Sequence, residues 1–296
     1  MTPLMIGAGE ALWDLLPAGR QLGGAPANFA YHARALGARG AVVSAVGDDA
    51  WGREILERLD GLGLDRRAVT TVPGRPTGTV TVTLDARGVP SFTIHENVAW
   101  DYIPVSEAAL SLASRADALC FGTLAQRAET SRQSIRRLIQ ATPPGALRIF
   151  DVNLRQRFFS PELIDGLLAV SNVLKLNDAE LPIVADLFAL RGSEADILKT
   201  LVARRSLRLA ALTRGEKGCL LVAPQGICER DGLKVTVSDT VGAGDAFTAA
   251  MALGLLWDWP LDRIAEQATR VAACVCARPG ATPAYTAADC GWAMGD

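Results

Sequence analysis

The stretch from Asp239 to Phe247 reads DTVGAGDAF and continues into an Ala-, Leu- and Met-rich helix that ends near Trp257. Gly242 and Gly244 lack Cβ atoms, so the backbone N–H groups around Ala243 can approach an anion at the N-terminus of this helix. Asp245 falls in the first helical turn, where the helix dipole keeps a carboxylate ionised. A short strand at 234–238 is expected to lead into the turn. The stretch therefore predicts a strand, an anion-binding turn and a helix, which are the building units of an α/β fold.

This turn suits phosphoryl transfer. The glycines would stabilise negative charge on the transferred group, and Asp245 would accept a proton from the attacking hydroxyl. Glycine-rich turns with an aspartate also cap helices for structural reasons alone. The rest of the chain is needed to distinguish a catalytic turn from a structural helix cap.

Apolar and β-branched runs alternate with helical patterns over most of the 296 residues, which is typical of a parallel sheet flanked by helices. Strands are expected at Leu4–Ala8, Ala41–Val46, Ala118–Phe121, Leu147–Val152, Val173–Leu176, Leu209–Leu212 and Cys219–Val222. Helices are expected at Pro26–Leu36, Thr130–Ala141 and Glu194–Ala203. Because no linker rich in Pro, Gly or Ser interrupts the pattern, we expect residues 1–296 to form one α/β domain with a doubly wound, mainly parallel sheet.

A β-hairpin is predicted at residues 77–94. Thr77–Leu84 reads TGTVTVTL, Asp85–Gly88 is a turn, and Val89–Ile94 reads VPSFTI. A hairpin between two βα units does not easily join a parallel sheet, so we expect it to project from the core as a small β lid. The lid would close over a site or form a homodimer interface. An ordinary edge hairpin without function is the alternative.

The composition argues against several classes of protein. Lys and Arg number 30 against 32 Asp and Glu, without a basic run, so a nucleic-acid partner is unsupported. The longest apolar runs fall well short of the roughly 18 residues of a spanning helix. Glu10 comes too early for a signal peptide, so we expect a cytoplasmic protein without a membrane partner. Six scattered cysteines are expected as buried free thiols, and two histidines supply too few ligands for zinc.

The DTVGAGDAF stretch resembles the C-terminal signature of the ribokinase-like, or PfkB, family of carbohydrate kinases. Further motifs resemble the family's in the same order along the chain: Gly9–Asp14 (GEALWD), Gly23–Asn28 (GGAPAN), Asp151–Arg155 (DVNLR), Asn177–Glu180 (NDAE) and Thr213–Gly218 (TRGEKG). The residues of the first three of these motifs are most similar to those of the fructokinases. The resemblance implies ATP-dependent phosphorylation of a small sugar, with fructose as the expected acceptor at its primary 6-hydroxyl. Asp245 would be the general base, and Gly242, Ala243 and Gly244 would form the anion hole.

Asp14, Gly24, Asn28 and Arg155 are expected to bind the sugar. Asp14 and Asn28 are short polar side chains beside glycines, suited to hydrogen bonds with sugar hydroxyls, and Gly24 lets the backbone approach. Arg155 follows a strand, and ligands of open α/β sheets bind outside the carboxyl ends of strands. Its guanidinium is therefore expected to contact a ketose or the transferred phosphate. Turn and helix capping, or a surface ion pair for Arg155, are the structural alternatives.

Asn177 and Glu180 follow a predicted strand, with a spacing that places both on one side of the next helix's first turn. The resemblance implies that they organise Mg²⁺ and the nucleotide phosphates, with Glu180 acting on the metal through water. A helix cap with an acidic first turn is the alternative. Thr213, Gly215 and Gly218 resemble the family's ATP-binding turn, although an ordinary β-turn would use the same residue types.

The resemblance also implies a monovalent cation such as K⁺ beside the anion hole. Its expected wall is Asp239, the carbonyl of Val241 and the segment that contains Gly280. The composition and spacing of the chain alone would not have suggested this site.

Other functions stay open or are disfavoured. A kinase for another sugar, a sugar acid or a nucleoside, such as ribose, 2-keto-3-deoxygluconate or adenosine, would keep the same motifs. A noncatalytic sugar or nucleotide sensor on the same fold stays open, although it would not need Asp245 as a base. A nicotinamide-dependent dehydrogenase is disfavoured, because Leu12 stands where the fingerprint that starts at Gly7 needs its third glycine. A P-loop NTPase is disfavoured by the lack of a GxxxxGK[ST] run.

Overall fold

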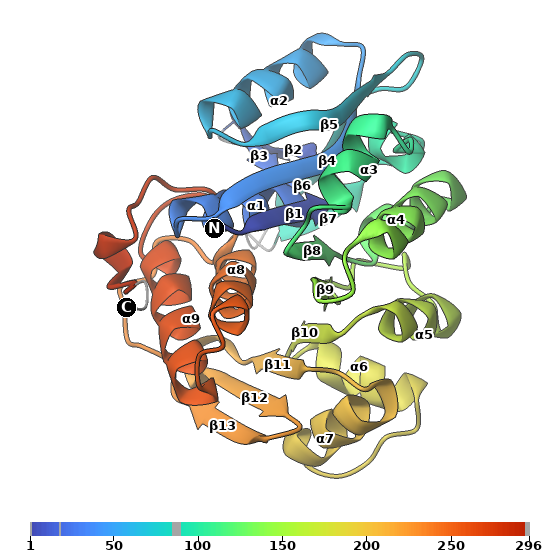
Figure 1. Cartoon of the computed structure of the whole chain (residues 1–296). Coiled ribbons are helices and arrows are strands. Elements are labelled where there is room, and N and C mark those ends of the chain that lie inside the picture. The colour runs from blue at the N-terminus through green and yellow to red at the C-terminus, as the bar shows by residue number, and fades with distance from the viewer. Residues whose placement is uncertain (1, 18, 85–89, 294–296) are drawn as a thin grey trace.

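A nine-stranded sheet forms the centre of the molecule, in the order β13-β12-β11-β10-β9-β8-β1-β4-β5 (Figure 1). The computed structural model describes residues 2–17, 19–84 and 90–293. The strands are β1 (Leu4–Ala8), β4 (Arg39–Gly47), β5 (Asp65–Val72), β8 (Ala118–Phe121), β9 (Leu147–Asp151), β10 (Val173–Asn177), β11 (Leu209–Thr213), β12 (Cys219–Ala223) and β13 (Gly226–Arg230). The pairs from β5 to β11 are parallel, and β12 and β13 add an antiparallel edge. The predicted doubly wound, mainly parallel sheet is confirmed.

Strand β1 shows why this sheet is buried on both faces. Leu4, Ile6 and Ala8 belong to one hydrophobic core, whereas Met5 between them belongs to a second core on the other face. Successive side chains of a strand point to opposite faces, so a strand covered on both sides reads as a continuous apolar run. This is the pattern from which the seven strands were predicted, and all seven are present within two residues of their expected ends.

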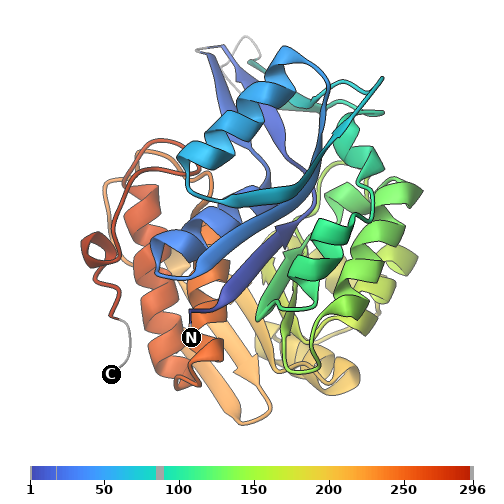
Figure 2. The same ribbon diagram turned by 45° about the horizontal axis from the view of Figure 1, so that its top comes forward.

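Helices cover the two faces separately (Figures 1 and 2). One layer contains α1 (Ala25–Ala35), α8 (Ala243–Leu256) and α9 (Leu261–Cys276), and α1 packs against α8. The other contains α3 (Glu107–Ala113), α4 (Glu129–Ala141), α5 (Pro161–Val170), α6 (Glu180–Leu187) and α7 (Glu194–Arg205), while α2 (Ala50–Gly61) packs beside β4 and β5. The chain reverses direction along the sheet at β1, between β8 and β4. Loops at the carboxyl ends of strands meet at such a switch point, which is where open α/β sheets bind ligands.

The predicted lid belongs to a second sheet of four strands, in the order β3-β2-β6-β7. Its strands are β2 (Leu12–Leu16), β3 (Gly19–Gly23), β6 (Gly78–Leu84) and β7 (Pro90–Ile94). Both strands of the predicted hairpin are present and antiparallel, and the predicted turn at Asp85–Gly88 lies outside the described residues. The projecting sheet is therefore larger than expected, because β2 pairs with β6 of the hairpin and β3 pairs with β2.

The strand expected at 234–238 is wrong. Residues 231–240 form neither helix nor strand, and β13 takes the place beside β12. The backbone N–H groups of Ser238 and Asp239 instead donate to the carbonyl of Cys276 at the end of α9, at 2.8 and 3.2 Å. The segment before the glycine turn is therefore a loop held by a helix end.

The expectation of six free thiols is also wrong for one pair. Cys274 on α9 and Cys290 in the short helix η4 (Ala288–Cys290) form a disulfide, because the chain after α9 folds back along that helix. Cys120, Cys219 and Cys228 are buried free cysteines, and Cys276 is a half-buried one. Within the described ranges, the structure contains no helix that is both long and apolar enough to span a membrane.

Candidate active site

The glycine turn opens α8 in a conformation that requires glycine. Gly242 is the N-cap residue with φ 80°, and a Cβ there would lie 2.8 Å from Ala281 Cα. A Cβ on Gly244 would lie 3.1 Å from Lys175 Nζ. The turn is thus packed against backbone on one side and against a buried ammonium group on the other. The N-terminus of α8 can face an anion, although the N–H of Ala243 here donates to the carbonyl of Thr240 at 3.4 Å.

Asp245 and Asn28 meet at this turn. Asn28 lies on α1, is 4% exposed, and donates a hydrogen bond from Nδ2 to Asp245 Oδ2 at 2.9 Å. The two residues are 217 positions apart in the chain, and the packing of α1 on α8 brings them together. Among the described residues, Asn28 Oδ1 is buried without a partner. A ligand hydroxyl would satisfy this acceptor.

The carboxyl of Asp245 titrates far from its usual range. Burial, with a smaller contribution from the nearby charge of Asp151, raises its pKa to about 7, although the Asn28 hydrogen bond and the charges of Lys175 and Arg155 oppose the shift. A carboxyl with this pKa is an effective proton acceptor near neutral pH. Together with its place in the first turn of α8, this fits the predicted general base.

Asp14 and Gly24 lie on the lid side of the same region. Asp14 is on β2, which pairs with β3, and burial raises its pKa to about 6 against the charge of Arg155. Gly24 has φ 119°, and a Cβ there would lie 3.3 Å from Ala11 Cα. The junction between β3 and α1 at Gly24 therefore packs against the segment that follows β1. This contact places Asn28 of α1 in the site.

Glu10 is a further carboxyl of this region that the sequence interpretation did not assign. It follows β1, is 4% exposed, and has one buried oxygen, Oε2, without a partner in the described part of the chain. Burial raises its pKa to about 7, and the charges of Arg155 and Asp245 also act on it. The feature of the sequence that could have revealed Glu10 is an ionisable residue shortly after a buried strand.

Arg155 lies in the loop after β9, where it was predicted. Its side chain is exposed and donates to the carbonyl of Leu154 at 2.9 Å. Its positive charge opposes the rise in the pKa values of Glu10, Asp14 and Asp245, so the guanidinium is close enough to act electrostatically on all three carboxyls. The loop is also tied to the lid, because Gln156 Nε2 donates to the carbonyl of Phe92 on β7 at 2.7 Å.

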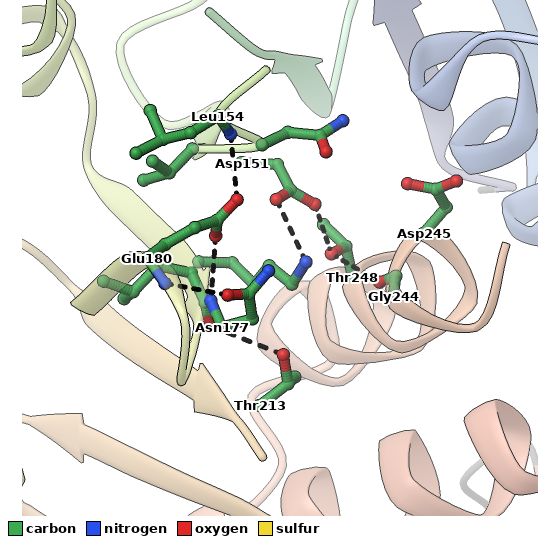
Figure 3. A network of polar contacts seen from close by, with 12 residues as sticks. Asp151, Leu154, Asn177, Glu180, Thr213, Gly244, Asp245 and Thr248 are labelled. Atoms are coloured by element: carbon green, nitrogen blue, oxygen red, sulfur yellow. Dashed lines mark hydrogen bonds and ion pairs between the residues drawn. The ribbon is translucent and has the colours of Figure 1, made fainter. Parts of the chain in front are cut away.

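Asn177 and Glu180 form a hydrogen-bonded unit after β10 (Figure 3). Asn177 Oδ1 accepts from the N–H of Glu180 at 2.9 Å, and Glu180 Oε2 accepts from the N–H of Asn177 at the same distance. The other oxygen, Oε1, accepts from the N–H of Leu154 at 2.9 Å. Glu180 is buried, which raises its pKa, and it joins the loops after β9 and β10.

Asp151, Lys175 and Thr248 form a second network that the sequence interpretation missed (Figure 3). Asp151 Oδ1 lies 3.0 Å from Lys175 Nζ, and Thr248 Oγ1 lies 3.0 Å from Asp151 Oδ2. Although burial opposes it, the carboxylates of Asp151, Glu180 and Asp245 raise the pKa of Lys175. The network joins β9 and β10 to α8 below the glycine turn. In the sequence, the feature that could have revealed this network is a lysine inside the apolar run of β10.

A cavity of about 1020 Å³ lies beside the turn. The predicted nucleotide-binding residues Asn177, Thr213, Gly215 and Gly218 line it, whereas Glu180 is buried behind Asn177. Other wall residues are Lys175, Val235, Val237, Gly244, Phe247, Thr269, Ala272, Ala273 and Cys276. The wall also contains the charged residues Glu216, Lys217, Asp231 and Lys234. A large cavity whose surface is mostly apolar, with some polar groups, is typical of a cofactor site. Its size and its glycines fit a nucleotide whose phosphates reach Gly244.

Asp239, Val241 and Gly280, the residues expected to form the wall of a cation site, are joined by hydrogen bonds. Asp239 Oδ1 accepts from the N–H of Val241 at 3.0 Å, and Oδ2 accepts from the N–H of Gly280 at 3.0 Å. Asp239 therefore bridges the loop before the glycine turn and the chain after α9. Its oxygens keep lone pairs, and oxygen ligands suit a hard cation.

Comparisons with known proteins agree with this fold. The chain is 29% identical over 237 residues to a sugar kinase of Pyrococcus horikoshii, covering 79% of this chain and 73% of that protein. It is 30% identical over 280 residues to the fructokinase of Salmonella typhimurium, covering 90% of each. The crystal structure of the uncharacterised Pyrococcus enzyme in complex with ATP matches with a TM-score of 0.81 at 26% identity, covering 95% of this chain and 94% of that one.

The fructokinase of Vibrio cholerae, in a form with fructose, ADP and calcium bound, matches with a TM-score of 0.79 at 26% identity over 95% of both chains. A double mutant of that enzyme, with fructose, ADP and potassium bound, has the same TM-score at 26% identity, over 95% of this chain and 94% of that one. The model of the pfkB family of carbohydrate kinases matches residues 18–288. The protein therefore belongs to the pfkB family of carbohydrate kinases.

Proposed function

We propose that this carbohydrate kinase transfers the γ-phosphoryl group of ATP to the primary 6-hydroxyl of fructose. One contact carries the proposal: Asn28, from the sugar-binding motif, donates to Asp245, the candidate base, at 2.9 Å. The neighbouring Gly244 lines the large cavity. A sugar held by Asn28 would therefore present a hydroxyl to Asp245 on the side that faces the nucleotide.

In this mechanism Asp245 accepts the proton of the 6-hydroxyl while the hydroxyl oxygen bonds to the γ-phosphorus and ADP leaves. Its pKa of about 7 places a substantial ionised fraction at neutral pH. The N–H groups of Gly242, Ala243 and Gly244 would stabilise the charge on the transferred group, as fixed donors do in a water-poor site. Lys175 would add positive charge beneath Gly244.

The donor set fits Mg²⁺ held largely through water. Mg²⁺ keeps several waters and uses one or two carboxylates together with substrate phosphates. Asn177 lines the cavity, and Glu180 stands behind it with each oxygen already bonded to a backbone N–H. When bound, the metal would neutralise charge on the phosphates of ATP. Asn177 and Glu180 would hold it through its water shell.

For a monovalent cation we propose the wall formed by Asp239, Val241 and Gly280. The two amide hydrogen bonds fix the Asp239 carboxylate between the loops that flank the anion turn. When bound, K⁺ would add positive charge close to the transferred group. The potassium-bound fructokinase among the similar structures supports testing this ion first.

The charges around Asn28 favour a neutral sugar over a sugar acid. Glu10, Asp14 and Asp245 place three carboxyls in the region, and Arg155 is the cation whose charge acts on all of them. A carboxylate on the substrate would be repelled by these groups once they ionise. Neutral hydroxyls can instead donate to the carboxyls and to Asn28 Oδ1. This argument and the fructokinase relatives support fructose before 2-keto-3-deoxygluconate.

We also propose that residues 1–296 act as one domain with the four-stranded sheet as its lid. Phe92 on β7 is 54% exposed, and a homodimer through this sheet would cover it. Sedimentation of the protein at several concentrations tests the dimer, and a monomer at all of them would overturn it. A cytoplasmic location stays a prediction from the sequence.

The deciding experiment measures ADP release with magnesium ATP and fructose, ribose, glucose, 2-keto-3-deoxygluconate or adenosine, each with and without K⁺. The highest kcat/KM with fructose is expected, and phosphorus–proton coupling in the NMR spectrum of the product should place the phosphate on carbon 6. A higher kcat/KM with another acceptor would keep the kinase mechanism and overturn fructose. Binding of sugar and nucleotide without turnover of any acceptor would instead favour the sensor.

A further inference from the structure

His32 is a completely buried histidine outside the groups used in the mechanism above. It lies on α1, with Nε2 3.0 Å from the carbonyl oxygen of Ala281 and Nδ1 2.9 Å from the hydroxyl of Tyr285. Burial lowers its pKa to about 4, so the ring is neutral. A carbonyl oxygen only accepts, so the proton is assigned to Nε2, and Nδ1 accepts from the Tyr285 hydroxyl.

The carbonyl that His32 holds lies directly behind the glycine turn. A Cβ on Gly242 would come closest to this same Ala281 oxygen, and would lie 2.8 Å from Ala281 Cα and 2.9 Å from its carbonyl carbon. The preceding residue, Gly280, donates its N–H to Asp239 at 3.0 Å. The segment 280–285, called the strap below, is therefore the back wall of the anion turn.

Helix α1 contacts the glycine turn and its back wall at two points. Asn28 and His32 are four residues apart, which places both on one face of the helix. Asn28 donates to Asp245 at one end of the turn, and His32 donates to the strap behind Gly242 at the other. Helix α1 therefore contacts both the base and the backbone wall behind the anion-binding N–H groups.

We infer that His32 is a positioning residue for phosphoryl transfer: through Ala281 it fixes the backbone of Gly242, and with it the N–H groups of the anion turn relative to Asp245. The inference rests on the proposed role of this turn. Loss of one fixed donor to a developing charge costs about 10²- to 10³-fold in kcat. Loosening the wall behind the donors should cost less, about tenfold or more.

Two amide substitutions separate the two contacts of the ring. In His32→Gln the side-chain N–H₂ takes the place of Nε2 and can still donate to Ala281. In His32→Asn the shorter amide takes the place of Nδ1 and reaches only toward Tyr285. We expect His32→Gln to keep kcat within about threefold of wild type and His32→Asn to lose about tenfold or more, with the KM for the sugar little changed in both.

Tyr31→Phe is the matched control. Tyr31 is the neighbour of His32 and donates to Pro283 in the same strap at 2.6 Å, but Pro283 is not the residue behind Gly242. This variant should lose stability without losing kcat. Hydrogen exchange supplies a readout independent of turnover: the amides of Gly242 to Gly244 should exchange faster in His32→Asn and at the wild-type rate in Tyr31→Phe.

Equal kcat in His32→Asn and His32→Gln, or unchanged exchange at the turn in His32→Asn, would overturn the inference. Failure of His32→Asn to fold would leave the comparison of His32→Gln with Tyr31→Phe, in which a tenfold lower kcat in the glutamine variant would also overturn it. The variant Asp245→Asn, assayed in parallel, keeps the two proposals apart. If it retains high activity, the proposed base is wrong whatever the histidine variants do.

Discussion

Lys175 Nζ lies 3.0 Å from Asp151 Oδ1, and both side chains are buried beneath the anion turn. The same ammonium group lines the large cavity and would lie 3.1 Å from a Cβ on Gly244. Thr248 on α8 donates a hydrogen bond to the other oxygen of Asp151. The pair thus supports the turn mechanically and places positive charge next to the predicted path of the phosphoryl group.

Replacing Lys175 by Met should strongly destabilise the protein. The change leaves the Asp151 carboxylate buried without its partner, and breaking a buried ion pair in this way costs about 3–5 kcal/mol. Urea denaturation measures the loss. The double variant Lys175→Met with Asp151→Asn removes the stranded charge and should recover most of it. A single variant that loses less than about 1 kcal/mol would show that the pair is dispensable for stability.

The kcat of the wild-type enzyme should rise as the pH passes through about 7, the pKa of Asp245. The base must be ionised to accept a proton, so activity falls about tenfold for each pH unit well below that value. In Asp151→Asn the midpoint should move to lower pH, because the lost negative charge had raised the pKa of Asp245. A midpoint unmoved by this change would contradict the coupling. ADP release at saturating substrates over a pH series supplies the measurement.

The fold could be predicted from the sequence because its strands carry apolar side chains on both faces. The missed strands are those without this pattern. β3 (Gly19–Gly23) reads GRQLG and is mostly exposed, and β13 reads GICER with one buried residue. Such strands are defined by their pairing with β2 and β12, which no local pattern shows. The wrongly expected strand at 234–238 is the opposite case. Its alternating valines resemble a strand, but the segment pairs with no strand of either sheet, and the N–H groups of Ser238 and Asp239 donate to the carbonyl of Cys276 at the end of α9.

The candidate site was predictable where glycines and motif spacing marked it, as at Gly242 and Asn28. Lys175 was missed because it lies inside a strand that reads as ordinary core, and Asp151, although it begins the DVNLR motif, was given no role. Only the sheet register brings the two together. Their Coulomb coupling to Asp245 depends on burial, which spacing cannot supply. Glu10 was passed over for the same reason: its neighbours Asp245 and Arg155 come from distant parts of the chain.

The stability of Asp245→Asn should exceed that of wild type more at pH 8 than at pH 5. The folded protein raises the pKa of Asp245 from 3.8 to about 7. An acid whose pKa rises on folding binds its proton more tightly when folded, so its stabilising contribution is present at low pH and is lost as the pH rises through the folded value. The asparagine cannot ionise, and its Oδ1 can still accept from Asn28. Thermal unfolding of both proteins across this pH range makes the comparison, and a difference in Tm that does not grow with pH would refute it.

Alanine should destabilise the protein at Gly242 but have little effect on its stability at Gly244. At Gly242, φ is 80° and a Cβ would meet the backbone of Ala281. The left-handed conformation alone costs a non-glycine residue about 1–2 kcal/mol, and the Ala281 carbonyl behind it is held by His32, so it cannot yield easily. Gly242→Ala should therefore unfold at clearly lower urea than wild type and lose activity with it.

Gly244 is helical, and a Cβ there meets only the end of the Lys175 side chain at 3.1 Å. A helical glycine replaced by alanine gains about 1 kcal/mol in propensity, which offsets a small shift of the ammonium group. Gly244→Ala should accordingly keep a near wild-type unfolding midpoint while kcat falls, because the new methyl group occupies the space beside the cavity where a phosphate would approach the helix N-terminus. Equal destabilisation of the two variants would mean that the turn is constrained by the helix itself and not by the wall at Ala281.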